Sequence, residues 1–186
     1  MNRIIKISSP LNDYIIQDLK AGDEVYISGK IYTARDMAHK RLVDLIEKGQ
    51  TLPIDLKGNI IYYAGPTPHK PGKVIGSIGP TTSGRMDLFT PKLLDAGLKG
   101  MIGKGNRSDK VIESIKKNKA IYFVAIGGAA ALISKSIISS KIVCYEDLLA
   151  EAINELIVED FPLIVAIDSF GNNLYDIGIE KYRIQY

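Results

Sequence analysis

The chain has 186 residues, of which 46% are hydrophobic and 24% charged, a composition typical of a globular protein with one core. The formal net charge is only +3, and Lys and Arg are spread along the chain, so the sequence lacks the clustered basic face of a nucleic-acid-binding protein. A single cysteine, Cys144, excludes an intrachain disulfide and any metal centre built from several thiolates of this chain.

The first third of the chain predicts two strands and two helices within a single domain that spans residues 1–186. Residues 1–6 are too charged for a signal peptide, and no apolar run has membrane-spanning length, so we expect a cytoplasmic protein. The pattern predicts a strand over 3–7, a helix over 12–19 and a strand over 24–32. Gly29, inside the last of these, indicates a bulge or the close approach of another backbone.

A helix is predicted over 34–48, with Thr33 as its N-cap and Asp36 three residues later. Arg35 and His39 are four residues apart and should share a face. A cation in the first turn opposes the helix dipole, which suggests that Arg35 serves an anion outside the helix, although packing is an alternative. The buried face of this helix should hold Met37, Leu42, Leu45 and Ile46.

Residues 79–87 form the central motif of the sequence. A strand over 59–64 and a loop over 65–72 precede it, and a strand over 74–78 is expected to lead into it. Thr81, Thr82 and Ser83 offer hydroxyls at the expected start of a helix, and Arg85 can hold a carboxylate or phosphate with two parallel bonds. A plain strand–turn–helix with a polar cap explains the same pattern.

The rest of the chain continues the alternation of strands and helices, which predicts the α/β class. Lys104 lies between two glycines, so its backbone can approach a ligand closely. Glycine turns follow Ile78, Ile102 and Ile126, and in α/β sheets such turns gather at the carboxyl ends of strands. The remaining expected helices cover 92–96, 108–118, 129–132 and 146–151, and the remaining strands 100–103, 120–126, 142–145 and 163–167, with the structure of 174–186 left open.

Three motifs in fixed order, Thr33–His39, Gly79–Asp87 and Gly103–Ser108, resemble the β subunit or carboxy-terminal domain of class I iron–sulfur hydro-lyases. That family comprises fumarate hydratases and the related L-tartrate dehydratases. The resemblance implies a swivelling β/β/α fold and the reversible hydration of fumarate to (S)-malate. It also implies a [4Fe–4S] cluster ligated by a partner α subunit and not by this chain, in a hetero-oligomer, with a homodimer as the state of the isolated chain.

The resemblance also assigns roles to individual residues. It implies a substrate-binding site formed by Arg35, Arg85, Lys104, Thr82 and Asp36, with Thr81 and His39 as catalytic candidates. A threonine hydroxyl is a poor base, so Thr81 needs a nearby cation or a relay partner, and its alternative role is a helix cap. His39 has a pKa suited to proton transfer, but we favour a role in orienting Asp36 or Arg35.

The substrate is less sharply indicated than the site. Gly84, Asp87 and residues 106–108 resemble fumarases more than tartrate dehydratases. The alternatives are the β subunit of L-tartrate dehydratase or another 2-hydroxy-acid dehydratase, and a non-catalytic dicarboxylate-binding or assembly module. His69 receives no role from the resemblance, and we expect it at the surface.

Overall fold

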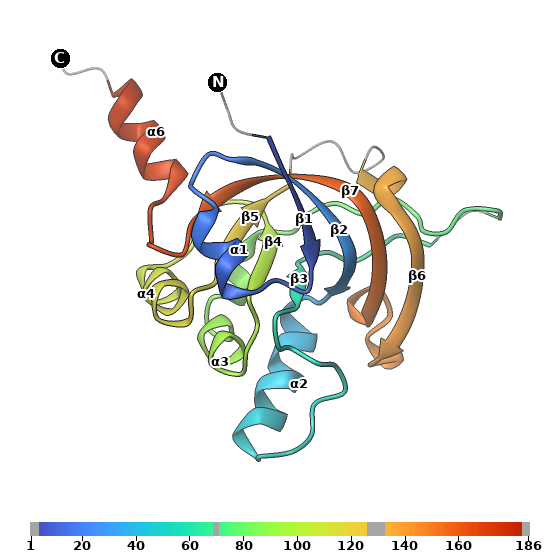
Figure 1. The fold of residues 1–186 in the computed structure, drawn as a ribbon. Coiled ribbons are helices and arrows are strands. Elements are labelled where there is room, and N and C mark those ends of the chain that lie inside the picture. Colours follow the sequence, from blue (N-terminus) through green and yellow to red (C-terminus); the bar gives the residue numbers. More distant parts are fainter. Residues whose placement is uncertain (1–3, 69–70, 126–132, 184–186) are drawn as a thin grey trace.

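A seven-stranded sheet curls until its strands β2 and β7 pair with each other, which closes a small barrel (Figure 1). This computed structural model describes residues 4–68, 71–125 and 133–183. The strand order is β1-β2-β3-β4-β5-β7-β6; neighbours from β1 to β5 are parallel, and β7 is antiparallel to β2, β5 and β6. The strands are β1 (Ile4–Ser9), β2 (Glu24–Thr33), β3 (Ile60–Tyr62), β4 (Gly100–Gly103), β5 (Ile121–Val124), β6 (Ile137–Cys144) and β7 (Ile153–Ile167).

Three helices, α2, α3 and α4, lie side by side against the outside of the barrel (Figure 1). The described helices are α1 (Asp13–Asp18), α2 (Asp36–Glu47), α3 (Thr90–Asp95), α4 (Asp109–Asn118) and α6 (Leu174–Tyr182). Short 3-10 helices are η1 (Ser83–Met86), η2 (Ser134–Ser136) and η3 (Glu146–Glu151). None of the helices in these ranges combines the length and apolar character needed to cross a membrane.

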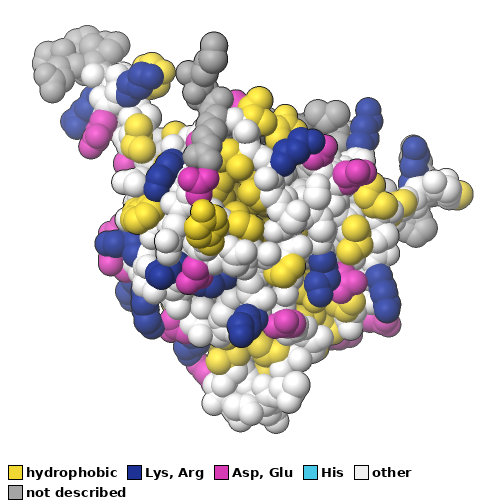
Figure 2. Space-filling model, in the orientation of Figure 1, with side chains coloured by type: hydrophobic (Ala, Val, Ile, Leu, Met, Phe, Trp, Pro, Cys, Tyr) yellow, Lys and Arg dark blue, Asp and Glu magenta, His cyan; other side chains and the backbone are white. Residues whose placement is uncertain are grey.

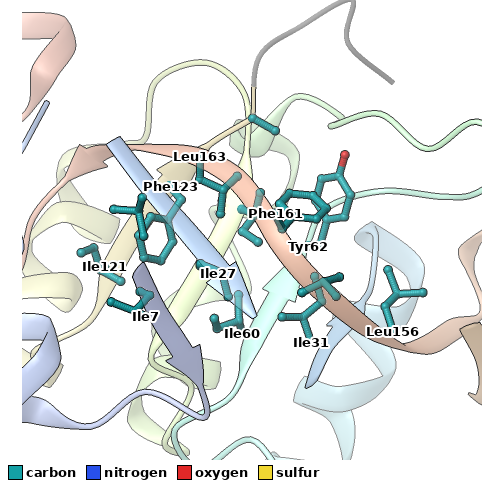
Figure 3. Packing of buried hydrophobic residues seen from close by; sticks show 14 of the residues in the cluster. Ile7, Ile27, Ile31, Ile60, Tyr62, Ile121, Phe123, Leu156, Phe161 and Leu163 are labelled. Carbon is teal, nitrogen blue, oxygen red and sulfur yellow. The ribbon is translucent and has the colours of Figure 1, made fainter. Parts of the chain in front are cut away.

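The sheet separates two hydrophobic cores. Alternate strand residues such as Ile27, Tyr62 and Phe123 point into the barrel and pack on one another (Figure 3). Their sequence neighbours Tyr63 and Tyr122 point outward and belong to the second core, with the apolar faces of the helices. Burial on both faces explains why the central strands read as unbroken apolar runs rather than as alternating patterns.

Several predicted features are confirmed. The fold is α/β, with a small barrel covered by helices, as the swivelling β/β/α resemblance implies. Gly29 has φ +110° at a register shift, and a Cβ there would lie 2.7 Å from the Ser9 carbonyl oxygen, so both interpretations of this glycine hold. α4 covers Asp109–Asn118, within the range predicted for this helix, although its N-cap residue Ser108 makes no side-chain cap bond. On the face seen in Figure 2, acidic and basic side chains are interspersed.

The prediction for the long C-terminal strand was wrong in its length. β7 runs for 15 residues from Ile153, whereas only 163–167 was expected. Asp160, with φ 47°, donates its backbone N–H to the Ser28 hydroxyl at a bulge, and this irregularity breaks the alternating pattern. Pro162, which precedes the predicted range, lies inside the strand opposite Tyr26.

Two predictions around the central motif were also wrong. Residues 74–78 form no strand; instead, the backbone N–H of Thr67 donates to the Ser77 carbonyl at 3.0 Å, and residues 65–68 and 71–78 form a projecting arm (Figure 1). α2 begins at Asp36, not at a Thr33 cap, because Thr33 ends β2 and its hydroxyl accepts the Asn154 N–H at 3.1 Å.

The buried face of α2 matches expectation only in part. Leu42 is buried as predicted, but Met37 is 45% exposed, and Ala38, His39 and Val43 complete the buried face. The segment from 174 onward, left open by the sequence, forms α6. His69 and the predicted helix over 129–132 lie outside the described residues.

Candidate active site

The predicted site residues lie near the carboxyl ends of β2, β3 and β4, which the parallel pairing places at one edge of the barrel. The loop before η1 is attached to these strand ends by backbone contacts. The N–H of Thr81 donates to the Tyr63 carbonyl at 2.7 Å, and the N–H of Ser83 donates to the Lys104 carbonyl at 2.9 Å. Thr82 also forms an isolated parallel β-bridge with Lys104. The loop therefore extends the sheet edge and leads into the short 3-10 helix η1.

The α-helix expected to start at this motif is not found. η1 is a four-residue 3-10 helix, and Thr82, its N-cap residue, makes no side-chain cap bond. Thr81 precedes this cap position, so the cap role considered for it is not found. Any anion bound here depends on side chains and not on a helix dipole.

An open pocket of about 270 Å³ lies at this edge. Arg35 and Lys104 contribute positive charge to it, Thr81 and Thr82 contribute hydroxyls, and the rest of its described lining is Gly65, Gly79 and Pro80. Among the described lining residues there is no carboxylate. Two cations and two hydroxyls without an acid suit a small, carboxylate-bearing ligand.

Arg35 is held in place by an acid that the sequence did not reveal. Its Nη2 lies 3.2 Å from Glu151 Oε1, and Glu151 Oε2 accepts the backbone N–H of Met37 at 3.2 Å. Glu151 therefore accepts a hydrogen bond from a backbone N–H at the start of α2 and orients Arg35 at the same time. The Arg35 Nε is buried and has no hydrogen-bond partner among the described residues. Glu151 lies 116 positions after Arg35, so no local pattern could have indicated it.

Arg85 and Asp36 pair with each other, and neither lines the pocket. Arg85 Nη2 donates to Asp36 Oδ2 at 2.8 Å, and Arg85 is about half-exposed. Burial opposes ionisation of Asp36, but a hydrogen bond from its own backbone N–H and the Arg85 charge outweigh it and lower the Asp36 pKa. The pair links η1 to the first turn of α2, next to Arg35.

His39 is fully buried and does not line the pocket. Burial lowers its pKa to about 4, with a smaller contribution from the nearby Arg107 charge. The neutral ring donates from Nδ1 to the Arg35 carbonyl at 2.8 Å, and its edge meets the Tyr63 ring at 5.1 Å between centroids. This geometry suits the orienting role on Arg35 better than proton transfer to a ligand.

The buried side chain of Arg107 holds the central loop in place. Arg107 Nε donates to Asp87 Oδ1 at 2.7 Å, and its Nη2 donates to the Thr90 hydroxyl at 2.7 Å. Asp87 Oδ2 also accepts the Ser108 N–H at 2.6 Å. Asp87 and Arg107, which resemble substrate-related positions in sequence, are thus structural residues that connect the loop to α4, and neither lines the pocket.

A second buried network positions Lys104. The hydroxyls of Ser83 and Tyr122 are 2.8 Å apart, and the Tyr122 hydroxyl donates to the Gly105 carbonyl at 2.8 Å. A Cβ at Gly103 would lie 1.9 Å from the Ser83 Oγ, so glycine is required there. Lys104 is therefore held between two fixed backbone positions while its side chain remains exposed.

The described residues do not fit a metal cluster. They contain no group of three or more His, Cys, Asp or Glu side chains that could hold a metal ion. Cys144 is partly buried, and burial raises its pKa to about 11, so it remains a thiol.

Comparison with known proteins gives consistent matches. A family model described as fumarase C-terminus matches residues 1–178. The "Putative L(+)-tartrate dehydratase subunit beta" of Methanocaldococcus jannaschii is 40% identical over 87% of this chain and 86% of its own. The aerobic class I fumarate hydratase of Escherichia coli is 37% identical over 92% of this chain, and fumarate hydratase 2 of Leishmania major is 36% identical over 92%. The chain spans only 32% and 30% of these two fumarate hydratases.

Proposed function

Because the chain belongs to the fumarase C-terminus family, we propose that it is the β subunit of an iron–sulfur-dependent hydro-lyase that interconverts fumarate and (S)-malate. Relatives named as fumarate hydratases and as a tartrate dehydratase subunit support a hydro-lyase role. The name of the M. jannaschii relative supports a separate β subunit with an α partner. The longer E. coli relative carries the equivalent region within one chain.

The observation that carries this proposal is the pocket itself. Arg35 offers a planar fork that matches a carboxylate, and Lys104 offers a point charge for a second one. A volume of about 270 Å³ is below the range typical of drug-sized ligands, which suits a four-carbon diacid. Arg85 stands beside this pair and can exchange its contact with Asp36 for a substrate carboxylate, because that contact uses one of its nitrogen atoms.

Thr81 is our candidate for proton transfer at the carbon next to the hydroxyl-bearing carbon of malate. Its place on the same pocket wall as Arg35 and Lys104 supplies the nearby positive charge that a threonine hydroxyl requires, because cations favour the deprotonated oxygen. Thr82 is the candidate hydrogen-bond donor to the substrate. In this proposal His39 orients Arg35, and Asp36 orients Arg85.

The [4Fe–4S] cluster is assigned to the partner α subunit, since the described residues of this chain offer no ligand set. When bound there it would supply a Lewis acid for the substrate hydroxyl. The part assigned to the present chain is to bind the carboxylates and to hold Thr81 at the substrate.

L-tartrate is the second candidate substrate. The M. jannaschii relative matches over nearly its whole length and is named for tartrate. The structure gives less support to the two residues, Gly84 and Asp87, that favour fumarate in the sequence. A Cβ at Gly84 would meet nothing within 4 Å, and Asp87 is occupied by Arg107 and Ser108.

Anaerobic reconstitution with a cluster-bearing α subunit, iron and sulfide tests the proposal, with fumarate and L-tartrate offered in parallel. We expect the chain alone to be inactive and the complex to hydrate fumarate. Tartrate preference would transfer the assignment to the second candidate. Malate dehydration by the chain alone would refute the division between two subunits, and dicarboxylate binding without turnover in the complex would indicate a non-catalytic module.

A further inference from the structure

An apolar groove of about 700 Å³ lies beside the pocket, between the arm of residues 65–68 and 71–78, strand β6 and η3. Val74, Ile75, Ile142 and Leu149 contribute to its lining, and Glu146 is the only charged side chain among its described lining residues. The arm reaches outward past β6 in Figure 1, so the groove is bordered by a projecting segment.

The groove and the pocket share a wall. Gly65 lines the pocket and Pro66, the next residue, lines the groove. A Cβ at Gly65 would lie 2.4 Å from the Ala150 carbonyl oxygen, so the arm and η3 are in direct contact there. Ala150 lines the groove, and its neighbour Glu151 holds Arg35. A chain seated in the groove would therefore reach the rim of the pocket.

Apolar side chains along this groove are presented to solvent. Leu149 is 82% exposed, with Val74 at 48% and Ile142 at 46%. The backbone of Leu149 has φ 53° and ψ −115°, a conformation that costs a leucine about 1–3 kcal/mol. The chain on both sides of Leu149 is joined to the α2 region, since Asp147 pairs with Arg41 at 2.8 Å and Glu151 pairs with Arg35 at 3.2 Å. A strained residue beside a candidate active site is typical of a functional segment.

We infer that this groove is the docking site for an apolar segment of the partner subunit that completes the pocket. The inference rests on the proposed function and identifies where that partner binds. The E. coli relative carries about two thirds of its length outside the region equivalent to this chain, and that remainder must pack against it if one site is shared. A second copy of this chain is the weaker occupant, because its described residues add no metal-holding group to the pocket.

Binding of the full chain to the cluster-bearing α subunit, measured by titration calorimetry, tests this inference. Leu149→Asp and Ile142→Asp should each weaken binding about tenfold or more, because a charge would replace an apolar contact in the buried interface. Tyr14→Asp is the matched control, since Tyr14 is 86% exposed on α1, and it should change the affinity less than twofold. Melting temperatures should confirm that all three variants fold.

The outcomes separate the two proposals. If wild type forms an active complex and both groove variants bind as tightly as the control, the docking site is wrong while the proposed function stands. If the groove variants abolish self-association of the isolated chain and leave α-subunit binding unchanged, a second copy occupies the groove and the inference fails. If wild type binds no cluster-bearing α subunit at all, the proposed function itself fails.

Discussion

Replacing Arg107 with alanine should destabilise the whole domain, because this side chain joins the central loop to the helical layer. Its guanidinium has no solvent exposure and contacts the Asp87 carboxylate and the Thr90 hydroxyl, each at 2.7 Å. It also lies 5.3 Å from the Tyr63 ring centroid and 5.0 Å from that of Tyr122. Its removal leaves a carboxylate that is only 16% exposed without its countercharge.

The size of this effect follows from the burial of the pair. Removing one partner of a buried ion pair typically costs about 3–5 kcal/mol. Asp87 keeps the Ser108 N–H and some solvent contact, so we expect about 3 kcal/mol, a large part of a total stability of about 5–15 kcal/mol. Arg41→Ala is the matched control, because Arg41 pairs with Asp147 at the surface and should lose less than about 1 kcal/mol.

Urea denaturation followed by circular dichroism measures both variants, with Asp87→Asn and the double variant closing a thermodynamic cycle. The double variant should lose less than the sum of the single losses, because the uncompensated charge is then gone. The reasoning is refuted if Arg107→Ala costs no more than Arg41→Ala, or if the cycle is additive within about 0.5 kcal/mol.

Three further predictions concern His39, Gly29 and Arg85. The pKa of His39 falls from 6.5 to about 4 on folding, so the unfolded state binds more protons than the folded state between these pH values. The stability that His39 contributes should therefore be complete above pH 6.5 and decrease as the pH falls toward 4. His39→Gln should lose this dependence, measured as urea midpoints at pH 5 and 7.5. Gly29→Ala should cost more than about 2 kcal/mol in urea denaturation, since φ is +110° and the new Cβ meets Ser9. Arg85→Lys should lower kcat/KM of the reconstituted complex at least about tenfold, because the planar fork is lost.

Each of these has a control. Gly84→Ala should leave stability almost unchanged, because its Cβ meets nothing within 4 Å, and an equal loss in both glycine variants would contradict the steric argument. Equal pH dependence in wild type and His39→Gln would show that His39 does not titrate on unfolding. Wild-type kinetics in Arg85→Lys would remove Arg85 from the site, and Lys92→Arg on α3 controls for charge-conserving change at an exposed cation.

Local chemistry accounts for what the sequence determined. The alternation of apolar runs and helical patterns predicted the α/β class, and Gly29 marked the close approach of β1. The resemblance carried by the ordered motifs singled out Arg35, Lys104, Thr81 and Thr82, and all four line one pocket in the structure. The strand and helix patterns and Gly29 depend on a few neighbouring residues, so they can be recognised without knowing the fold.

Contacts between distant segments decided the rest. Closure of the barrel by β7, the Glu151 partner of Arg35 and the Arg107 support of Asp87 each join segments from opposite parts of the chain or from different elements. His39 carries an ordinary side chain in sequence, and only complete burial against Tyr63 makes it a neutral orienting group. The sequence alone therefore singled out four residues that line the pocket, whereas tertiary packing decided the charge of His39, the partners of Arg35 and Asp87, and which of the candidates face the pocket.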